Sequence, residues 1–128
     1  MSRIGARENL MQLVFEYNFN KNTKDNAEEI YLNESLTKDD QDYIINGLNG
    51  IKEKYEEIIE LISQNLVKYS LDRICKTDLA ILIVSIYEIK YLNFPCKVVI
   101  NEAVELAKKY STDNSYKFVN GLLAKVVN

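Results

Sequence analysis

Histidine is absent from this sequence of 128 residues, which also has no tryptophan, one proline and four glycines. Without histidine, the usual forms of Ser–His–Asp and Cys–His catalysis are excluded, and the commonest ligand for transition metals is missing. We therefore expect a protein that is not an enzyme and that needs neither a metal ion nor a cofactor. Because proline and glycine are scarce while Leu, Ile, Glu and Lys are abundant, the composition favours helices.

Long hydrophobic runs are absent as well. The densest apolar segment, residues 79–92, is interrupted by polar and charged side chains, and no stretch reaches the roughly 18–20 apolar residues that a membrane span needs. The N-terminus lacks the apolar core of a secretory signal. The two cysteines, Cys75 and Cys96, are not in a CxxC pair, so reduced thiols are expected. We expect a cytoplasmic protein that forms one domain over residues 1–128.

The net charge of −3 is unevenly distributed along the chain. Residues 25–65 carry 11 acidic residues and 3 lysines, whereas the remainder carries 13 basic and 8 acidic residues. Such asymmetry is compatible with an anionic partner on the basic part of the surface. The plainer alternative is a solvated helical surface whose charges bind nothing.

The spacing of apolar residues predicts a series of helices with short connections. Helices are expected over residues 3–19, 26–32, 38 to about 66 with a break near 50–54, 76–92, 95–110 and 114–127, with a turn or short helix at 71–74. Thr37 and Asp40 resemble a capping box in which Asp replaces the usual Glu or Gln. The helix over 76–92 is apolar almost all round, so it should lie buried at the centre.

Two groups of residues have the chemistry of an RNA-binding surface. Phe118 lies at the edge of the last helix's apolar stripe beside Lys117, where an aromatic ring can stack on an unpaired base while lysine meets phosphate. Arg3 and Arg7 lie four apart on one face of the first helix and should overhang the bundle, where guanidinium groups can bind phosphate. The alternatives are a rim phenylalanine that closes the core and two solvated arginines.

A polar strip runs along the central helix and has two interpretations. It consists of Asp78, Ile81, Ser85 and Glu88. The strip could be a surface for a protein partner, or the exposed edge of an otherwise buried helix.

Four stretches of the chain resemble the NusB family of transcription antitermination factors, in the family's order and spacing. They are Ala6-Arg7-Glu8, Ile86-Tyr87-Glu88-Ile89, the run from Pro95 to Lys108 with Ile100-Asn101-Glu102-Ala103 inside it, and Lys117-Phe118-Val119-Asn120-Gly121-Leu122-Leu123. The resemblance spans essentially the whole chain and is strongest from Leu79 onward.

The resemblance implies an all-α fold of about seven helices packed as two three-helix bundles. It implies binding to the boxA element of ribosomal RNA transcripts and pairing with the ribosomal small-subunit protein NusE in the RNA polymerase antitermination complex, as a monomer or a homodimer. Carried over by position, the RNA side comprises Arg3, Arg7, Lys108, Asn114, Tyr116, Lys117 and Phe118. The protein-partner side comprises Phe15, Asp72, Asp78 and Ile81.

The sequence departs from the family pattern at two places that concern RNA. Ile4 stands where a basic residue is common, and Asn114 replaces an acidic residue of some members, which should partly offset the loss. Two alternatives remain. One is a stand-alone relative of the RNA-binding domain of ribosomal RNA cytosine methyltransferases, which is disfavoured because no catalytic domain follows. The other is a structural helical homodimer without an RNA ligand.

Overall fold

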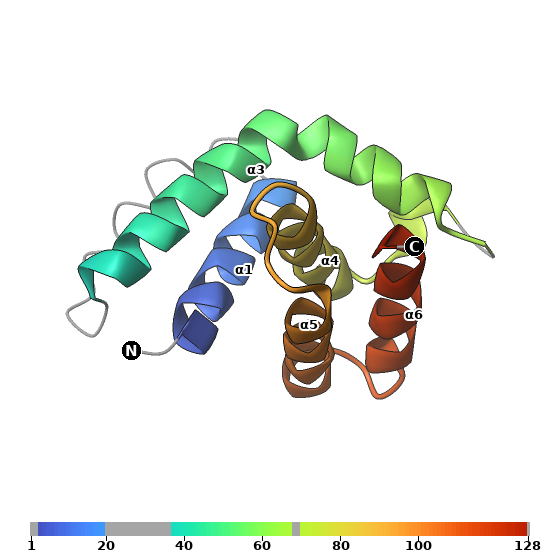
Figure 1. The fold of residues 1–128 in the computed structure, drawn as a ribbon. Coiled ribbons are helices and arrows are strands. Elements are labelled where there is room, and N and C mark those ends of the chain that lie inside the picture. Colours follow the sequence, from blue (N-terminus) through green and yellow to red (C-terminus); the bar gives the residue numbers. More distant parts are fainter. Residues whose placement is uncertain (1–2, 20–36, 68–69, 128) are drawn as a thin grey trace.

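The computed structural model describes residues 3–19, 37–67 and 70–127, and the side chains of all of these except residues 3, 4 and 19. The elements are α1 (Arg3–Phe19), α3 (Lys38–Gln64), the 3-10 helix η1 (Leu71–Arg73), α4 (Lys76–Lys90), α5 (Cys96–Tyr110) and α6 (Ser115–Val127) (Figure 1). Every element in these ranges is helical, so the expected all-α class is confirmed; the described ranges hold five α-helices and one 3-10 helix, where about seven helices were expected for the whole chain. The helix expected over residues 26–32 lies outside the described residues.

Helix α4 lies at the centre of the fold. It packs against α1, α3, α5 and α6, and Figure 1 shows it between the other helices. Helices α1, α3 and α4 contact one another, and so do α4, α5 and α6, so two groups of three helices share α4. Because all of its residues from Asp78 to Ile89 are buried, the prediction of a central buried helix is confirmed.

Helix α3 begins at the expected capping box. The Thr37 side-chain oxygen accepts from the Asp40 amide at 3.1 Å, and the Asp40 carboxylate accepts from the Thr37 amide at 3.3 Å. The predicted break near residues 50–54 is wrong, because α3 runs without interruption from Lys38 to Gln64. Gly50 has a different purpose, since a Cβ at this position would lie 1.9 Å from the Tyr87 hydroxyl oxygen. The glycine allows α4 to approach α3 closely and does not end the helix.

A tight turn connects α4 to α5. Asn93 has a φ of 57°, in the left-handed region that asparagine tolerates better than most residues. The Phe94 amide donates to the Glu88 carbonyl oxygen at 3.0 Å, and Pro95 precedes the first residue of α5. This turn lets α5 fold back and pack on α4.

Among the described helices, none is both long enough and apolar enough to cross a membrane.

Candidate nucleic-acid interface

The loop between α5 and α6 is held to the start of α4 by the Asp78 carboxylate. Ser111 donates to one carboxylate oxygen at 2.5 Å and Ser115 donates to the other at 2.9 Å. Asp78 is 5% exposed, so these hydroxyl groups replace the water that the buried carboxylate would otherwise require. The contacts fix where α6 begins and therefore where its outer residues lie.

Basic and aromatic side chains gather where the end of α5 meets the start of α6. The ammonium groups of Lys108 and Lys117 lie 5.1 and 5.9 Å from the centre of the Tyr116 ring. Lys108, Lys117 and Asn114 are exposed, while Tyr116 and Phe118 are half-buried against the core. These five residues are called the α5–α6 surface below. The structure thus brings together five of the seven residues predicted for the RNA side.

Lys108 of this surface is paired with an acidic side chain of its own helix. The Glu105 carboxylate is 3.7 Å from the Lys108 ammonium, and both side chains are more than half exposed. An exposed pair of this kind contributes about 1 kcal/mol or less. Lys108 can therefore exchange Glu105 for a phosphate at little cost.

A groove continues from the α5–α6 surface toward the end of α3. It has a volume of about 350 Å³ and lies between Leu66 and Val67 on one side and α6 on the other. From α6 it is lined by Lys117, Phe118, Gly121 and Lys125, among others. It is called the α3–α6 groove below. Gly121 and Lys125 follow Phe118 at helical spacing on α6, but the opposite wall comes from a segment some fifty residues earlier and has no local signal.

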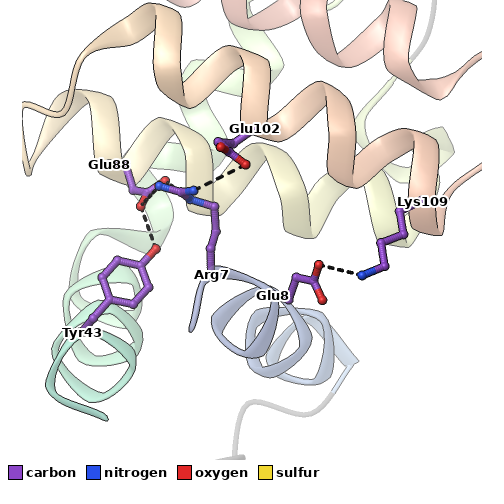
Figure 2. A network of polar contacts seen from close by, with 6 residues as sticks. All are labelled: Arg7, Glu8, Tyr43, Glu88, Glu102 and Lys109. Carbon is purple, nitrogen blue, oxygen red and sulfur yellow. Dashed lines mark hydrogen bonds and ion pairs between the residues drawn. The ribbon is translucent and has the colours of Figure 1, made fainter. Parts of the chain in front are cut away.

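Arg7 does not belong to this surface. Its Nε donates to the Glu88 carboxylate at 2.8 Å and its terminal nitrogen donates to the second carboxylate oxygen at 3.1 Å. The Tyr43 hydroxyl donates to the same carboxylate at 2.6 Å, and Glu102 lies 4.0 Å from the guanidinium (Figure 2). These four residues form the buried arginine cluster, in which Arg7 is 5% exposed and Glu88 is fully buried. The prediction that Arg7 overhangs the bundle is wrong, and direct contact of Arg7 with phosphate does not fit this burial.

The physical reason lies in the apolar line of α1. Arg7 is one turn before Leu10 on the same helix face, and Leu10 is fully buried, so the face that carries Leu10 into the core carries Arg7 with it. Burial by itself lowers the pKa of Arg7, but the hydrogen bonds and charge of Glu88, with contributions from Tyr43 and Glu102, outweigh it and raise that pKa above its ordinary value. Arg7 therefore stays charged and paired. The side chain of Arg3 is outside the described residues, so its predicted RNA contact stays a prediction.

A second polar contact joins α1 to α5 near this cluster. The Glu8 carboxylate accepts from the Lys109 ammonium at 2.9 Å and from the Tyr110 hydroxyl at 2.7 Å, and Figure 2 shows the Glu8–Lys109 pair beside Arg7. Partial burial would raise the pKa of Glu8, but the hydrogen bonds from Tyr110 and Lys109 outweigh burial and lower that pKa. Lys109 is thus paired with Glu8, whereas Lys117 on the α5–α6 surface has no carboxylate partner among the residues that the structure describes.

The residues predicted for the protein-partner side separate into two pairs. Phe15 is half-buried and Asp72 is exposed. Asp72 accepts a hydrogen bond from Ser70 and lines a pocket of about 450 Å³ with Tyr55. Asp78 and Ile81, in contrast, are 5% and 0% exposed.

The interpretation of the strip Asp78, Ile81, Ser85 and Glu88 as an exposed edge or partner face is therefore wrong. All four side chains are buried, because α4 has another helix packed on each side and retains no solvent-facing edge. Ser85 satisfies its hydroxyl by donating to the Ile81 carbonyl oxygen at 2.8 Å. Direct contact of Asp78 or Ile81 with a partner does not fit this burial.

Potential metal ligands do not cluster in the described part of the chain, where no group of three Cys, Asp or Glu side chains could hold an ion.

Comparison with known proteins identifies the class to which this helical fold and its basic, aromatic surface belong. The NusB family matches residues 5–128, and the chain therefore belongs to the NusB family. It is 45% identical over 130 residues to the transcription antitermination protein NusB of Clostridium perfringens (strain 13 / Type A), which covers 98% of this chain and 96% of that protein.

Solved structures agree with this assignment. The structure of T. maritima NusB is similar with a TM-score of 0.91 at 35% identity, covering 98% of this chain and 90% of that one. A crystal structure of the antitermination factors NusB and NusE in complex with double-stranded RNA is similar with a TM-score of 0.87 at 25% identity, covering 97% of this chain and 94% of that one.

Proposed function

We propose that this protein is a non-catalytic transcription antitermination factor of the cytoplasm that binds boxA RNA through its α5–α6 surface and pairs with NusE. The protein would act by binding the RNA and NusE and holding them in position, and no covalent bond would be made or broken. Lysines would contact phosphates and set affinity and register, while aromatic rings and base-edge contacts would favour a single-stranded element.

The observation that carries the proposal is that the exposed Lys108 and Lys117 lie over the half-buried Tyr116 ring, with the half-buried Phe118 next to Lys117 on α6, in a NusB-family chain. RNA is recognised by such a combination because bases stack on aromatic rings and phosphates attract cations. A relative of known structure is described in complex with NusE and double-stranded RNA. This supports both kinds of partner for the present chain.

For NusE, the proposal assigns the contact to Phe15 and Asp72. Both are accessible, and Asp72 borders the 450 Å³ pocket between α3 and η1. A charge at the rim of an interface mainly sets the association rate and selects against wrong partners. Asp72→Lys should therefore weaken NusE binding in calorimetric titration, whereas Asp42→Lys, an exposed carboxylate on the other end of α3, should not.

The RNA proposal is tested by fluorescence anisotropy with a labelled single-stranded boxA RNA. Lys117→Glu and Phe118→Asp should each weaken binding roughly tenfold or more, the size expected for losing a stacked base or reversing a phosphate contact. Lys38→Glu makes the same charge change at a site 88% exposed on the distant start of α3, and it should leave affinity within about twofold. Unchanged RNA affinity in both Lys117→Glu and Phe118→Asp would contradict the assignment of RNA binding to the α5–α6 surface.

The alternative is a structural helical homodimer without an RNA ligand. Light scattering with and without RNA distinguishes it from an RNA-binding protein. A homodimer whose mass and stability are indifferent to RNA would favour a purely structural protein over an RNA-binding one.

A further inference from the structure

We propose that the α3–α6 groove is the subsite for one unpaired nucleobase of the bound RNA, and that Gly121 is kept without a side chain so that the base can lie against the α6 backbone. This inference rests on the proposed function and goes beyond it. It assigns a groove that has one wall from α6 and a second wall from the segment that follows α3, Asn65 to Val67.

The first support is the shape and chemistry of the groove. Its volume of about 350 Å³ falls in the range of roughly 300–1,000 Å³ found for small-molecule sites. Its lining is mainly apolar, with Leu66 and Val67 from the segment after α3 and Phe118 from α6, beside the polar Asn65 and two lysines. Val67 is 76% exposed although its side chain is apolar, so a ligand that covers it removes apolar surface from water.

The second support is Gly121 itself. A glycine inside a helix destabilises it by about 1 kcal/mol relative to alanine. At Gly47 and Gly50 the reason for glycine is packing, because a Cβ would lie 2.7 Å from Leu10 and 1.9 Å from Tyr87. At Gly121 a Cβ would meet no described atom within 4 Å. The packing of the described chain does not require this glycine, whereas a flat ligand that approaches the backbone does.

The third support is the pattern of charge. Lys117, Gly121 and Lys125 are spaced four residues apart, so they lie on one face of α6 with the glycine between the two lysines. The residues that line the groove include these two lysines and no carboxylate. An apolar floor between two cations fits a base whose flanking phosphates reach the lysines. An apolar peptide segment would gain nothing from the two cations.

The test uses the full chain with Gly121→Ala, Gly121→Leu and the control Asn120→Ala, an exposed neighbour on α6 that does not line the groove. Both alanine variants should raise the melting temperature, by roughly 3–5 °C for Gly121→Ala, because alanine favours the helix. Gly121→Leu should weaken boxA RNA binding roughly tenfold or more, since its side chain fills the place of the base. Asn120→Ala should bind within about twofold of wild type.

A series of boxA RNAs, each with one base removed, provides the second measurement. One position should weaken binding to wild type and have no further effect on Gly121→Leu, because both changes remove the same contact. Equal affinity of wild type and Gly121→Leu for intact RNA overturns the inference while leaving the proposed function standing. Loss of NusE binding with unchanged RNA binding also overturns it and assigns the groove to the protein partner. Failure of wild type to bind RNA overturns the proposed function itself and the groove assignment with it.

Discussion

The buried arginine cluster and the α5–α6 surface both contain a cation beside an aromatic ring, yet they differ in burial and in the partners of the cation. In the cluster, Arg7 and Tyr43 both donate to Glu88 and are shut away from solvent. On the α5–α6 surface, Lys117 lies over Tyr116 and is exposed. The difference is whether a carboxylate from another helix reaches the cation.

The energies of the two regions differ accordingly. Removing one partner of a buried ion pair leaves an uncompensated charge and costs about 3–5 kcal/mol. Changing an exposed lysine shifts stability by about 0.5 kcal/mol or less. Substitutions in the cluster should therefore affect folding, and substitutions on the α5–α6 surface should affect ligand binding.

The largest effect is expected for Glu88→Gln, which keeps the shape of the side chain and leaves the charged, buried Arg7 guanidinium with only the more distant Glu102 carboxylate, 4.0 Å away. The free energy of unfolding in urea should fall by about 3–5 kcal/mol. Glu105→Gln is the matched control, because its side chain is 71% exposed, and it should change stability by about 0.5 kcal/mol or less. Equal stability of the two variants would contradict a structural role for the cluster.

A smaller effect is expected for Tyr43→Phe, which removes one hydrogen bond to the Glu88 carboxylate and leaves the Arg7 pair in place. The free energy of unfolding should fall by roughly 1.5–3 kcal/mol, the usual value for a hydrogen bond to a charged group. Tyr116→Phe is the control, and it should leave urea unfolding unchanged. A loss for Tyr116→Phe as large as for Tyr43→Phe would show that the ring hydroxyls, not the cluster, determine the result.

For the exposed side of the comparison, Lys117→Ala should leave unfolding unchanged and weaken RNA binding by about 1 kcal/mol. The slope of log binding constant against log salt concentration should also decrease in magnitude by about one, because one phosphate contact is lost. Anisotropy titrations at several salt concentrations measure both quantities. A drop in affinity with an unchanged salt slope would argue against a phosphate contact at this lysine.

The smallest effect concerns Glu8, whose pKa is lowered in the folded state from an ordinary value of 4.5. A carboxyl with a lowered folded pKa stabilises the protein above its unfolded pKa, and this stabilisation disappears as the pH falls through the folded pKa. The melting temperature of Glu8→Gln should therefore lie slightly below wild type at pH 7. The two should converge in acid below the folded pKa. If the difference in melting temperature between wild type and Glu8→Gln grew as the pH fell, this would contradict a lowered pKa of Glu8 in the folded state.

Much of the fold could be predicted from the sequence because helix signals are local. The limits of α1, the capping box at Thr37 and the burial of α4 all follow from spacing and capping chemistry within a few residues. The prediction failed at Gly50, where the reason for the glycine is the distant Tyr87. The residues next to Gly50 in the sequence do not indicate that Tyr87 packs against it.

The site was predictable to the same extent. Lys117 and Phe118 could be placed at the edge of the apolar stripe of α6 from helical spacing. The position of Arg7 on the Leu10 face of α1 was a local sign of burial, but its partner Glu88 is 81 residues away and has no local signal. Asp78 and Ile81 were misplaced for a related reason. A helix that is covered on every side has no edge, and only the packing of all four neighbours shows this.

The most direct test is a titration of the isotope-labelled protein with boxA RNA, followed by NMR. Binding at the α5–α6 surface predicts shifts of the amide signals of Lys108, Asn114, Tyr116, Lys117 and Phe118. The side-chain Nε–H signal of Arg7 should stay in place, since its hydrogen bond to Glu88 persists. A shift of the Arg7 signal with an undisturbed α6 would contradict the assignment of RNA to the exposed surface and of Arg7 to the core.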